Sequence, residues 1–278
     1  MSAGVFLAVL LAAFLHAGWN ALVKTGADKF RSMFVMSSAQ GLMGFVMLLF
    51  LPLPQGQVWL WLAASGLIHS LYKFFLASAY EHGDLSRVYP IARGAAPMIV
   101  LLAGAFLLSD RIDALDYAGV LAIGGGVVLM ARGVFRNGEA RRMLPWALAS
   151  AVATAGYSLV DGIGARIAGD ATQFVAWMFA IDGVIFAMFT LSAKGRSFVV
   201  CSRRVWGLGS LAGAASLGAY WIAVWAMTVA PIALVTALRE TSILFAVGLG
   251  AVLFGEKIDR GKAVAAALIV AGVVLTRL

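Results

Sequence analysis

The sequence predicts an all-α integral membrane protein with ten transmembrane helices, arranged as two inverted five-helix repeats. Of its 278 residues, 62% are hydrophobic and only 12% are charged, against about 25% charged in a typical soluble domain. A soluble fold of this size could not bury so much apolar surface, and the apolar residues gather in runs close to the roughly 20 residues that cross a bilayer. The same composition excludes intrinsic disorder, and the single cysteine, Cys201, excludes a disulfide framework.

Ten apolar runs follow one another along the chain, joined by short connections that contain Pro, Gly or clustered charge. The first run has no basic segment before it and is longer than the apolar core of a signal sequence, so we expect it to remain as a helix. The connections leave no room for a soluble domain. The predicted spans are Ala3–Val23, Met33–Leu51, Val58–Tyr80, Val88–Leu108, Leu115–Ala131, Leu144–Ile167, Ala171–Ala193, Trp206–Val229, Ile232–Phe254 and Ala263–Thr276.

The basic residues indicate how the helices are oriented. Of the 21 Lys and Arg residues, fifteen fall in one set of alternate connections. Three others, Arg111, Arg166 and Arg277, fall in the opposite set or near the termini. Membrane proteins keep an excess of Lys and Arg on the cytoplasmic side, so with ten spans both termini are expected outside. The formal charge of +8 is therefore interpreted as an orientation signal, and no nucleic-acid partner is expected.

The second half of the chain repeats the first. Residues 93–129 align with residues 239–275 at a constant offset of 146, with 11 identities in 37 positions. We therefore expect a first repeat over residues 1–135, a basic connecting loop over 136–143 and a second repeat over 144–278. Because each repeat has an odd number of helices, equivalent helices run in opposite directions. Transporters with such inverted repeats bind their substrate near the middle of the membrane.

Six ionisable side chains lie inside the predicted spans. A charge at a helix centre costs ~2.5–3.5 kcal/mol to insert, so each is expected to face a cavity or a partner. Arg93 and Arg239 lie eight residues past Leu85 and Pro231, which places them ~12 Å into a core ~30 Å thick. Two guanidinium groups near the midplane favour an anionic ligand. The other four groups are Lys73, Asp161, Asp182 and Glu240.

These six residues receive the following predicted roles. Arg93 and Arg239 bind the anionic group of a substrate, and Lys73 is an auxiliary cation. Asp182, Asp161 or Glu240 neutralises these cations or carries a coupling proton. The alternative is that the six groups pair with one another and only lock the helices together.

Polar and aromatic side chains at helical spacing are candidates for the walls of the transport path. We predict that four of them line the path and that His16 belongs with the coupling groups, while His69 has the weaker claim to a lining role. Interfacial anchoring of the aromatic residues is the alternative. The four lining candidates are Trp19, Asn20, Tyr72 and Tyr157.

The sequence contains none of the short motifs of ATPases, serine hydrolases or zinc proteases. Its three histidines are scattered, so they do not form a metal-ligand pattern. We therefore expect no catalytic residues, no metal and no cofactor. The expected partners are the lipid bilayer, a small-molecule solute and a coupling proton.

Several stretches resemble a known family. The acidic–basic pairs after the fourth and ninth helices (110–111 and 256–257), the Gly-rich tenth helix and the ten-helix pattern resemble the EamA-like branch of the drug/metabolite transporter superfamily. Residues 16–24 and 83–97 are similar to a subgroup of membrane proteins associated with phosphonate utilisation. The resemblance implies a multi-pass carrier in the inner (plasma) membrane, driven by an ion or exchange gradient. Many such members keep both termini in the cytoplasm, whereas the distribution of Lys and Arg in this chain favours the reverse.

These observations predict a secondary active transporter that moves a small anionic or zwitterionic metabolite by alternating access. An amino acid, an organic acid or a phosphonate would fit. One alternative is a membrane enzyme that acts on a lipid-linked substrate, with its reactive groups near one interface. The other is a scaffold that transports nothing, in which every buried charge is paired and no cavity reaches the charges.

Overall fold

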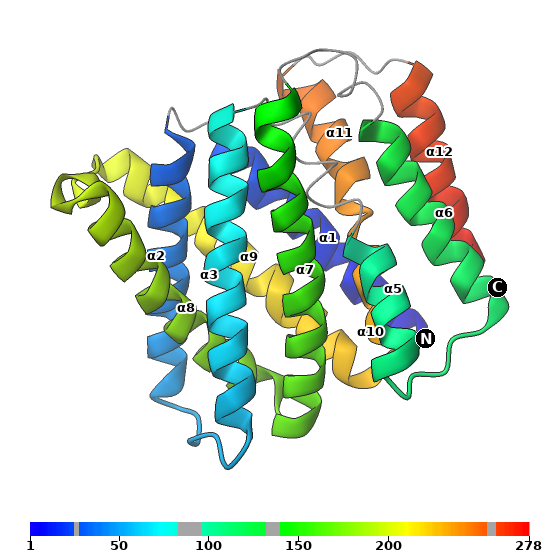
Figure 1. The fold of residues 1–278 in the computed structure, drawn as a ribbon, viewed down its shortest axis with the longest axis horizontal. Helices are drawn as coiled ribbons and strands as arrows, with labels where there is room; N and C mark the ends of the chain where they lie inside the picture. The colour runs from blue at the N-terminus through cyan, green and yellow to red at the C-terminus, as the bar shows by residue number, and fades with distance from the viewer. Residues whose placement is uncertain (25–27, 83–95, 132–139, 255–259, 278) are drawn as a thin grey trace.

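The computed structural model describes residues 1–24, 28–82, 96–131, 140–254 and 260–277, and every regular element within them is a helix (Figure 1). The elements are α1 (Ala3–Lys24), α2 (Lys29–Leu48), α3 (Val58–His82), α5 (Ala96–Leu107), α6 (Ala114–Ala131), α7 (Ala140–Ala168), α8 (Ala171–Lys194), the 3₁₀ turn η2 (Arg196–Val199), α9 (Arg203–Val229), α10 (Ile232–Arg239), α11 (Ser242–Phe254) and α12 (Arg260–Leu275).

Polar residues at the helix ends fix where several helices begin and end. Asp28 caps α2 by accepting the backbone N–H of Arg31 at 2.9 Å. Asp170 accepts two backbone N–H groups at the start of α8, and Ser202 accepts one at the start of α9. Gly195, with a φ of +79°, ends α8 in a conformation that favours glycine. Because these caps satisfy the free backbone groups of each helix end, short polar connections are sufficient.

The prediction of a multi-pass, all-helical membrane protein is confirmed. Six described helical segments are long and apolar enough to cross a bilayer, and two shorter apolar segments, Ala96–Leu107 and Ala114–Leu129, accompany them. Large apolar side chains point outward, such as Phe106, which is 89% exposed, as expected where lipid covers the surface. The count of ten spans stays a prediction. The six segments are Ala3–Val23, Val58–Ala79, Arg142–Ala168, Ala171–Lys194, Arg203–Val229 and Ile232–Leu253.

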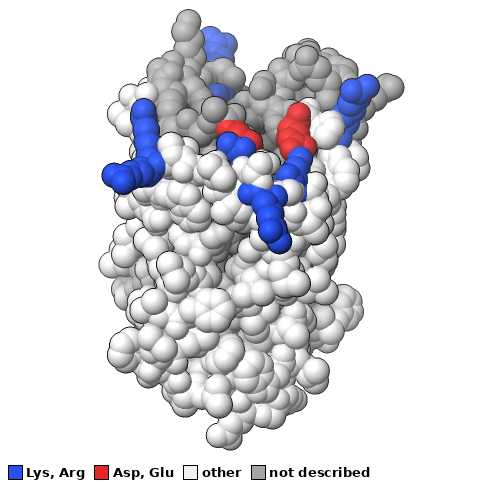
Figure 2. Space-filling model, turned by 90° about the vertical axis from the view of Figure 1, so that its left-hand side faces the viewer, with Lys and Arg blue, Asp and Glu red and all other residues white. Residues whose placement is uncertain are grey.

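Charged side chains gather at one end of one face of the bundle. Both termini lie at one end, where Arg277 donates a hydrogen bond to the carbonyl of Met1 at 2.9 Å (Figure 1). On the face shown in Figure 2, the charged side chains gather toward the opposite end, and the rest of that face shows neither Lys and Arg nor Asp and Glu. Which end faces the cytoplasm stays a prediction.

The two repeats meet at a seam between α6 and α12. α5 and α11 begin at residues 96 and 242, and α6 and α12 at 114 and 260, so both pairs keep the 146-residue offset. A Cβ atom added to Gly119 would lie 2.8 Å from the carbonyl oxygen of Gly272, and one added to Gly126 would lie 2.9 Å from that of Ala265. Gly272 is the counterpart of Gly126, and Ala265 that of Gly119. Equivalent residues therefore meet across a local two-fold axis, as an inverted repeat requires.

The two halves interlock in the rest of the bundle. α3 packs on α7 and α8, while α9 packs on α1 and α2, so each half supplies helices to the other half's surface. α2 and α8 approach closely at Gly41 and Gly183, where a Cβ atom added to Gly41 would lie 3.0 Å from the Cα atom of Gly183. Small residues at such crossings let helix backbones come together inside a membrane.

A polar cluster near the terminal end of the bundle joins three parts of the chain. Arg166, near the end of α7, forms an ion pair with Asp110, with an Nη1–Oδ1 distance of 2.7 Å. Its guanidinium also donates to the backbone carbonyls of Met227 and Ala230 at the end of α9. Asp110 in turn accepts the backbone N–H of Ile232 at the start of α10. We call Arg166 and Asp110 the terminal-side lock.

The structure differs from the sequence prediction at the ninth span. One continuous helix was expected over Ile232–Phe254, but α10 ends at Arg239 and α11 begins at Ser242. The N–H of Ile243 bonds the carbonyl of Glu240 in a tighter i to i+3 pattern, and the Thr241 hydroxyl donates to the carbonyl of Leu238. These local bonds interrupt the regular helix. The interruption leaves Arg239 at the end of a half-helix inside the bundle.

Candidate functional site

A small cavity lies between the two halves. Its volume is about 30 Å³, enough for about two water molecules. A larger solute therefore requires the helices to move apart. The helices that line it are α1, α2, α3, α7, α8, α9 and α10. The lining residues are His16, Trp19, Met36, Gln40, His69, Tyr72, Lys73, Tyr157, Phe179, Ser216, Tyr220 and Arg239.

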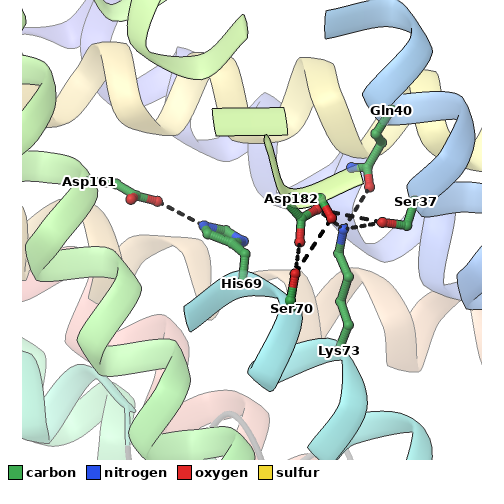
Figure 3. A network of polar contacts seen from close by, with 7 residues as sticks. All are labelled: Ser37, Gln40, His69, Ser70, Lys73, Asp161 and Asp182. Atoms are coloured by element: carbon green, nitrogen blue, oxygen red, sulfur yellow. Dashed lines mark hydrogen bonds and ion pairs between the residues drawn. The ribbon is translucent and has the colours of Figure 1, made fainter. Parts of the chain in front are cut away.

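Lys73 and Asp182 form a buried ion pair at the edge of this cavity (Figure 3). The ammonium group also donates to Ser37 at 2.8 Å and to the side-chain carbonyl of Gln40 at 3.3 Å. Asp182 is fully buried, and its second carboxylate oxygen accepts a hydrogen bond from Ser70 at 3.0 Å. Every charged atom of the pair is thus compensated, which is the condition for keeping ions in a membrane interior.

A second buried pair joins α3 to α7. The Nε2 atom of His69 lies 2.8 Å from the Oδ2 atom of Asp161 (Figure 3). The hydroxyl of Tyr220 donates to the same oxygen. The other oxygen, Oδ1, is buried and has no hydrogen-bond partner in the described part of the chain. This carboxylate is therefore less completely satisfied than that of Asp182.

Aromatic rings enclose the histidine side of the cavity. Tyr157 stacks on His69, with ring centroids 4.2 Å apart and an interplanar angle of 22°. Tyr72 and Tyr220 approach Tyr157 edge-on at 5.4 and 5.7 Å. Phe179 lies 5.9 Å from Tyr220. The arrangement gives the cavity rigid apolar faces with hydroxyl groups at their edges.

Arg239, the last residue of α10, brings a further cation to the cavity wall. It is 4% exposed, and its Cζ atom lies 5.0 Å from the centroid of the Tyr220 ring. Within the described part of the chain, the Tyr220 ring is the contact of the Arg239 guanidinium, and no hydrogen bond joins its five N–H donors to another described residue. Glu240 follows directly and is fully buried at the helix break.

The first helix contributes a linked pair. The indole Nε1 of Trp19 donates to Nδ1 of His16 at 3.1 Å, and both side chains line the cavity. Asn20 behaves differently, because its amide donates to the backbone carbonyl of His16 one turn earlier at 2.8 Å. Its side chain is not among the cavity-lining residues.

The structure therefore gathers most of the candidates that the sequence singled out. It joins Lys73 to Asp182 and His69 to Asp161, and it places Arg239 in the wall of the same cavity as Lys73 and His69. Arg93 lies outside the described residues. The functions assigned to these side chains stay predictions.

Sequence reasoning missed several members of the site. Tyr220 was not selected, although it lies in an apolar span next to Trp221. Ser37 and Gln40 are spaced three apart, and Ser70 and Lys73 likewise, which places each pair on one helix face. That spacing was the available signal. Phe179 carried none, since an aromatic residue in an apolar helix is usually part of the core.

Comparisons with known proteins agree with this architecture. The model of the EamA-like transporter family matches residues 2–132 and 141–278, which are the two repeats. The crystal structure of another protein has a TM-score of 0.79 with this chain. The two chains share 22% sequence identity, and the match covers 99% of this chain and 97% of that chain. No curated protein matches the sequence. Because the family model spans both repeats and nearly the whole length, the chain belongs to the EamA-like transporter family and is a membrane transporter.

Proposed function

We propose that the protein is a secondary active transporter for a small organic anion or zwitterion, and that Arg239 binds the anionic group. The observation that carries the proposal is a buried guanidinium beside a cavity shared by both repeats. Lys73 and His69, which also line that cavity, each face a carboxylate of their own. Among the described lining residues, Arg239 is thus the cation whose N–H donors have no acceptor of their own.

The chemistry of the guanidinium narrows the ligand. Its planar fork matches a carboxylate, phosphate or phosphonate with two parallel hydrogen bonds. Arg239 ends α10 and Ser242 begins α11, so the N-terminal end of a half-helix, the end that favours an anion, lies at the same break. Arg93, the counterpart of Arg239 in the first repeat, is proposed as a second anion ligand. Lys73 keeps its proposed auxiliary role through the electrostatic field of the Lys73–Asp182 pair.

The aromatic walls suggest the rest of the ligand. Tyr72, Tyr157 and Trp19 present ring faces and edges rather than further charge, so an apolar or amino-bearing body of modest size would fit. An amino acid, an organic acid or a phosphonate meets this description. The similarity to phosphonate-associated membrane proteins supports including phosphonates among the candidates.

Alternating access follows from the interlocked repeats. The cavity is too small for such a solute in this conformation, and inverted repeats can exchange conformations around a central site. The Lys and Arg distribution supports an inner-membrane orientation with both termini outside. The buried charges lie well inside the bundle rather than at one interface, which supports a carrier over an enzyme acting on lipid.

Binding and transport of defined probes test this function. We would measure the unfolding temperature of detergent-purified protein with 2-aminoethylphosphonate, L-phenylalanine, L-glutamate and succinate, since a ligand of the native state raises that temperature. The best stabiliser would then be followed as a labelled solute in proteoliposomes. Arg239→Ala removes charge-assisted hydrogen bonds of about 1.5–3 kcal/mol, so binding should weaken about 10- to 100-fold.

Arg204→Ala is the matched control, because Arg204 is exposed at the start of α9 and far along the helix from the cavity. It should bind and transport like the wild type. Undiminished binding by a folded Arg239→Ala protein would refute the role given to Arg239.

A further inference from the structure

We propose that His69 and Asp161, assisted by Tyr220, form a proton-binding site that couples solute movement to a proton gradient. The inference rests on the proposed transport function and adds the coupling ion and its binding site. It starts from the difference between the two buried carboxylates, of which one is fully compensated and the other is not.

Asp182 has no need of a further proton. One of its oxygens meets the ammonium group of Lys73, and the other accepts a hydrogen bond from Ser70. Ser37 lies within 3.5 Å as well. An ionised carboxylate with a full cation and hydroxyl donors around it is stable in its charged form. This pair is therefore a fixed, neutral element of the cavity wall.

Asp161 is in the opposite situation. Its two donors, His69 and Tyr220, both approach Oδ2, and the buried Oδ1 is left without a partner among the described residues. With a neutral imidazole, the group holds one uncompensated negative charge in a low-dielectric interior. One added proton converts it to an imidazolium–carboxylate pair with no net charge. The described surroundings of Asp161 therefore favour the uptake of one proton.

The proposed step is the binding and release of one proton at the His69 ring, and no other covalent bond forms or breaks. A proton carried by cavity water adds to the imidazole nitrogen of His69 that faces away from Asp161, while the Nε2–H group keeps its hydrogen bond to the Asp161 carboxylate, so that the ring becomes an imidazolium. Loss of that proton to water on the other side of the membrane restores the neutral ring. His69 lines the cavity, so water in the cavity can reach the ring.

The proton site shares its walls with the anion site. Arg239 lies over one face of Tyr220, and the His69 ring meets the same tyrosine edge-on at 5.0 Å. Adding a proton raises the positive potential of the cavity and so favours an anion on Arg239. By thermodynamic reciprocity the anion favours the proton. The proton and the anion are therefore expected to bind together and to move in the same direction.

The surroundings contain the groups that a pH response must take into account. α5 contributes no ionisable side chain over 96–107, and α2 contributes the uncharged Ser37 and Gln40. The ionisable residues around the pair are His16 on α1, Tyr72 and Lys73 on α3, Tyr157 on α7, Asp182 on α8, Tyr220 on α9, and Arg239 with the adjoining Glu240 on α10. Of these, His16 is the other group that ordinarily titrates near neutral pH.

Gradient-driven uptake tests the coupling directly. Proteoliposomes clamped at zero membrane potential would be given the labelled probe with and without a pH difference of one unit. One proton per solute drives up to about tenfold accumulation per pH unit. The wild type should approach that ratio. His69→Gln and Asp161→Asn should accumulate nothing above the outside concentration, yet still exchange labelled for unlabelled probe at equal pH.

His82→Gln is the matched control, because His82 is exposed at the end of α3. It should keep the gradient-driven accumulation. Tyr220→Phe should retain part of it, since the carboxylate and imidazole remain. Proton-driven accumulation by the His69→Gln protein would overturn the proposal, and so would wild-type uptake that ignores the pH difference while exchange persists.

A second measurement needs no transported solute. The chain has three histidines, so ¹⁵N-labelled imidazoles can be resolved by NMR and His69 assigned with the His69→Gln variant. The His69 signal should change from that of a neutral ring to that of a protonated ring when the sample is acidified. A His69 signal that is the same in acidic and in alkaline samples would refute the proton site. Failure of every probe to be exchanged would instead refute the transport proposal, and the NMR result would still decide the proton site.

Discussion

Lys73 and Asp182 show what a buried charge requires in this protein. Their carboxylate and ammonium groups are surrounded by Ser37, Gln40 and Ser70, so neither charge faces lipid. The cost of bringing two ions into the membrane is offset only while both partners remain. Removing one leaves the other without compensation.

Single substitutions of this pair should therefore destabilise the protein more than the double substitution does. Lys73→Met and Asp182→Leu should each lower the free energy of unfolding by about 3–5 kcal/mol, whereas the double variant should recover most of that loss. Thermal unfolding in detergent measures both. Lys194→Met, which breaks the exposed pair with Glu81, is the control and should change stability by about 1 kcal/mol or less. A double variant no more stable than either single one would contradict this account.

The sequence identified many of the residues of the candidate site, but it did not show which of them pair with each other. An ionisable side chain in an apolar run is visible directly, which is how Lys73, Asp161, Asp182 and Arg239 were selected. Lys73 and Asp182 are 109 positions apart, and nothing in the spacing indicates that α3 and α8 are neighbours. Asn20 illustrates the reverse case, since an apparently suitable position turns its amide to its own helix.

Among the elements, the seam between α6 and α12 depends on backbone contact. Gly125 and Gly126 are adjacent, yet only the second faces the partner helix closely. A Cβ atom at Gly126 would meet the Ala265 carbonyl oxygen at 2.9 Å, whereas one at Gly125 would meet only a methyl group of Leu268 at 3.8 Å. A backbone oxygen cannot rotate away as a side chain can.

Alanine at these two glycines should give opposite results. Gly126→Ala should force α6 and α12 apart and lower stability by about 1–3 kcal/mol. Gly125→Ala should be neutral or slightly stabilising, because alanine favours a helix over glycine by up to about 1 kcal/mol. Unfolding temperatures of the two proteins, prepared in parallel, decide the matter. Equal losses for both would show that the seam is not formed as described.

Helix positions followed closely from hydropathy, but the break at Glu240 and Thr241 did not. Apolar composition continues on both sides of it, so a window average sees one span. The interruption arises from hydrogen bonds between residues three or four positions apart, including the bond from the Thr241 hydroxyl to the carbonyl of Leu238. The helix breaks where i to i+3 bonds and the side-chain bond replace regular α-helical bonds. Apolar composition does not indicate where this replacement occurs.

At the scale of the whole molecule, the two halves have the same arrangement of helices, but their described polar contacts differ. α3 meets α7 and α8 through two ion pairs. The corresponding contact of α9 with α2 is made by small residues, with Gly209 against Val35 and Gly213 against Ala39. At the terminal end, the terminal-side lock of Arg166 and Asp110 ties α7 to the end of α9. Opening the bundle on that side must break the lock.

Weakening the lock should make the cavity more accessible from the terminal side. In a Cys201→Ser background, Ser216→Cys places a thiol in the cavity wall. Arg166→Gln loses the ion pair and part of the hydrogen bonding, on the order of 1.4 kcal/mol, so a membrane-impermeant thiol reagent on that side should label Ser216→Cys about tenfold faster. Arg111→Gln, an exposed charge on the same side, should leave the labelling rate unchanged. Identical rates in all three proteins would contradict the gating role.

The interlocking of the halves also constrains the order of events during synthesis. Lys73 precedes Asp182 by 109 residues, which at 5–20 residues per second corresponds to about 5–20 s of translation. His69 waits for Asp161 almost as long. Throughout that interval the nascent α3 must reside at the membrane with its amine unneutralised, sheltered by the insertion machinery or by water, until the second half of the polypeptide emerges.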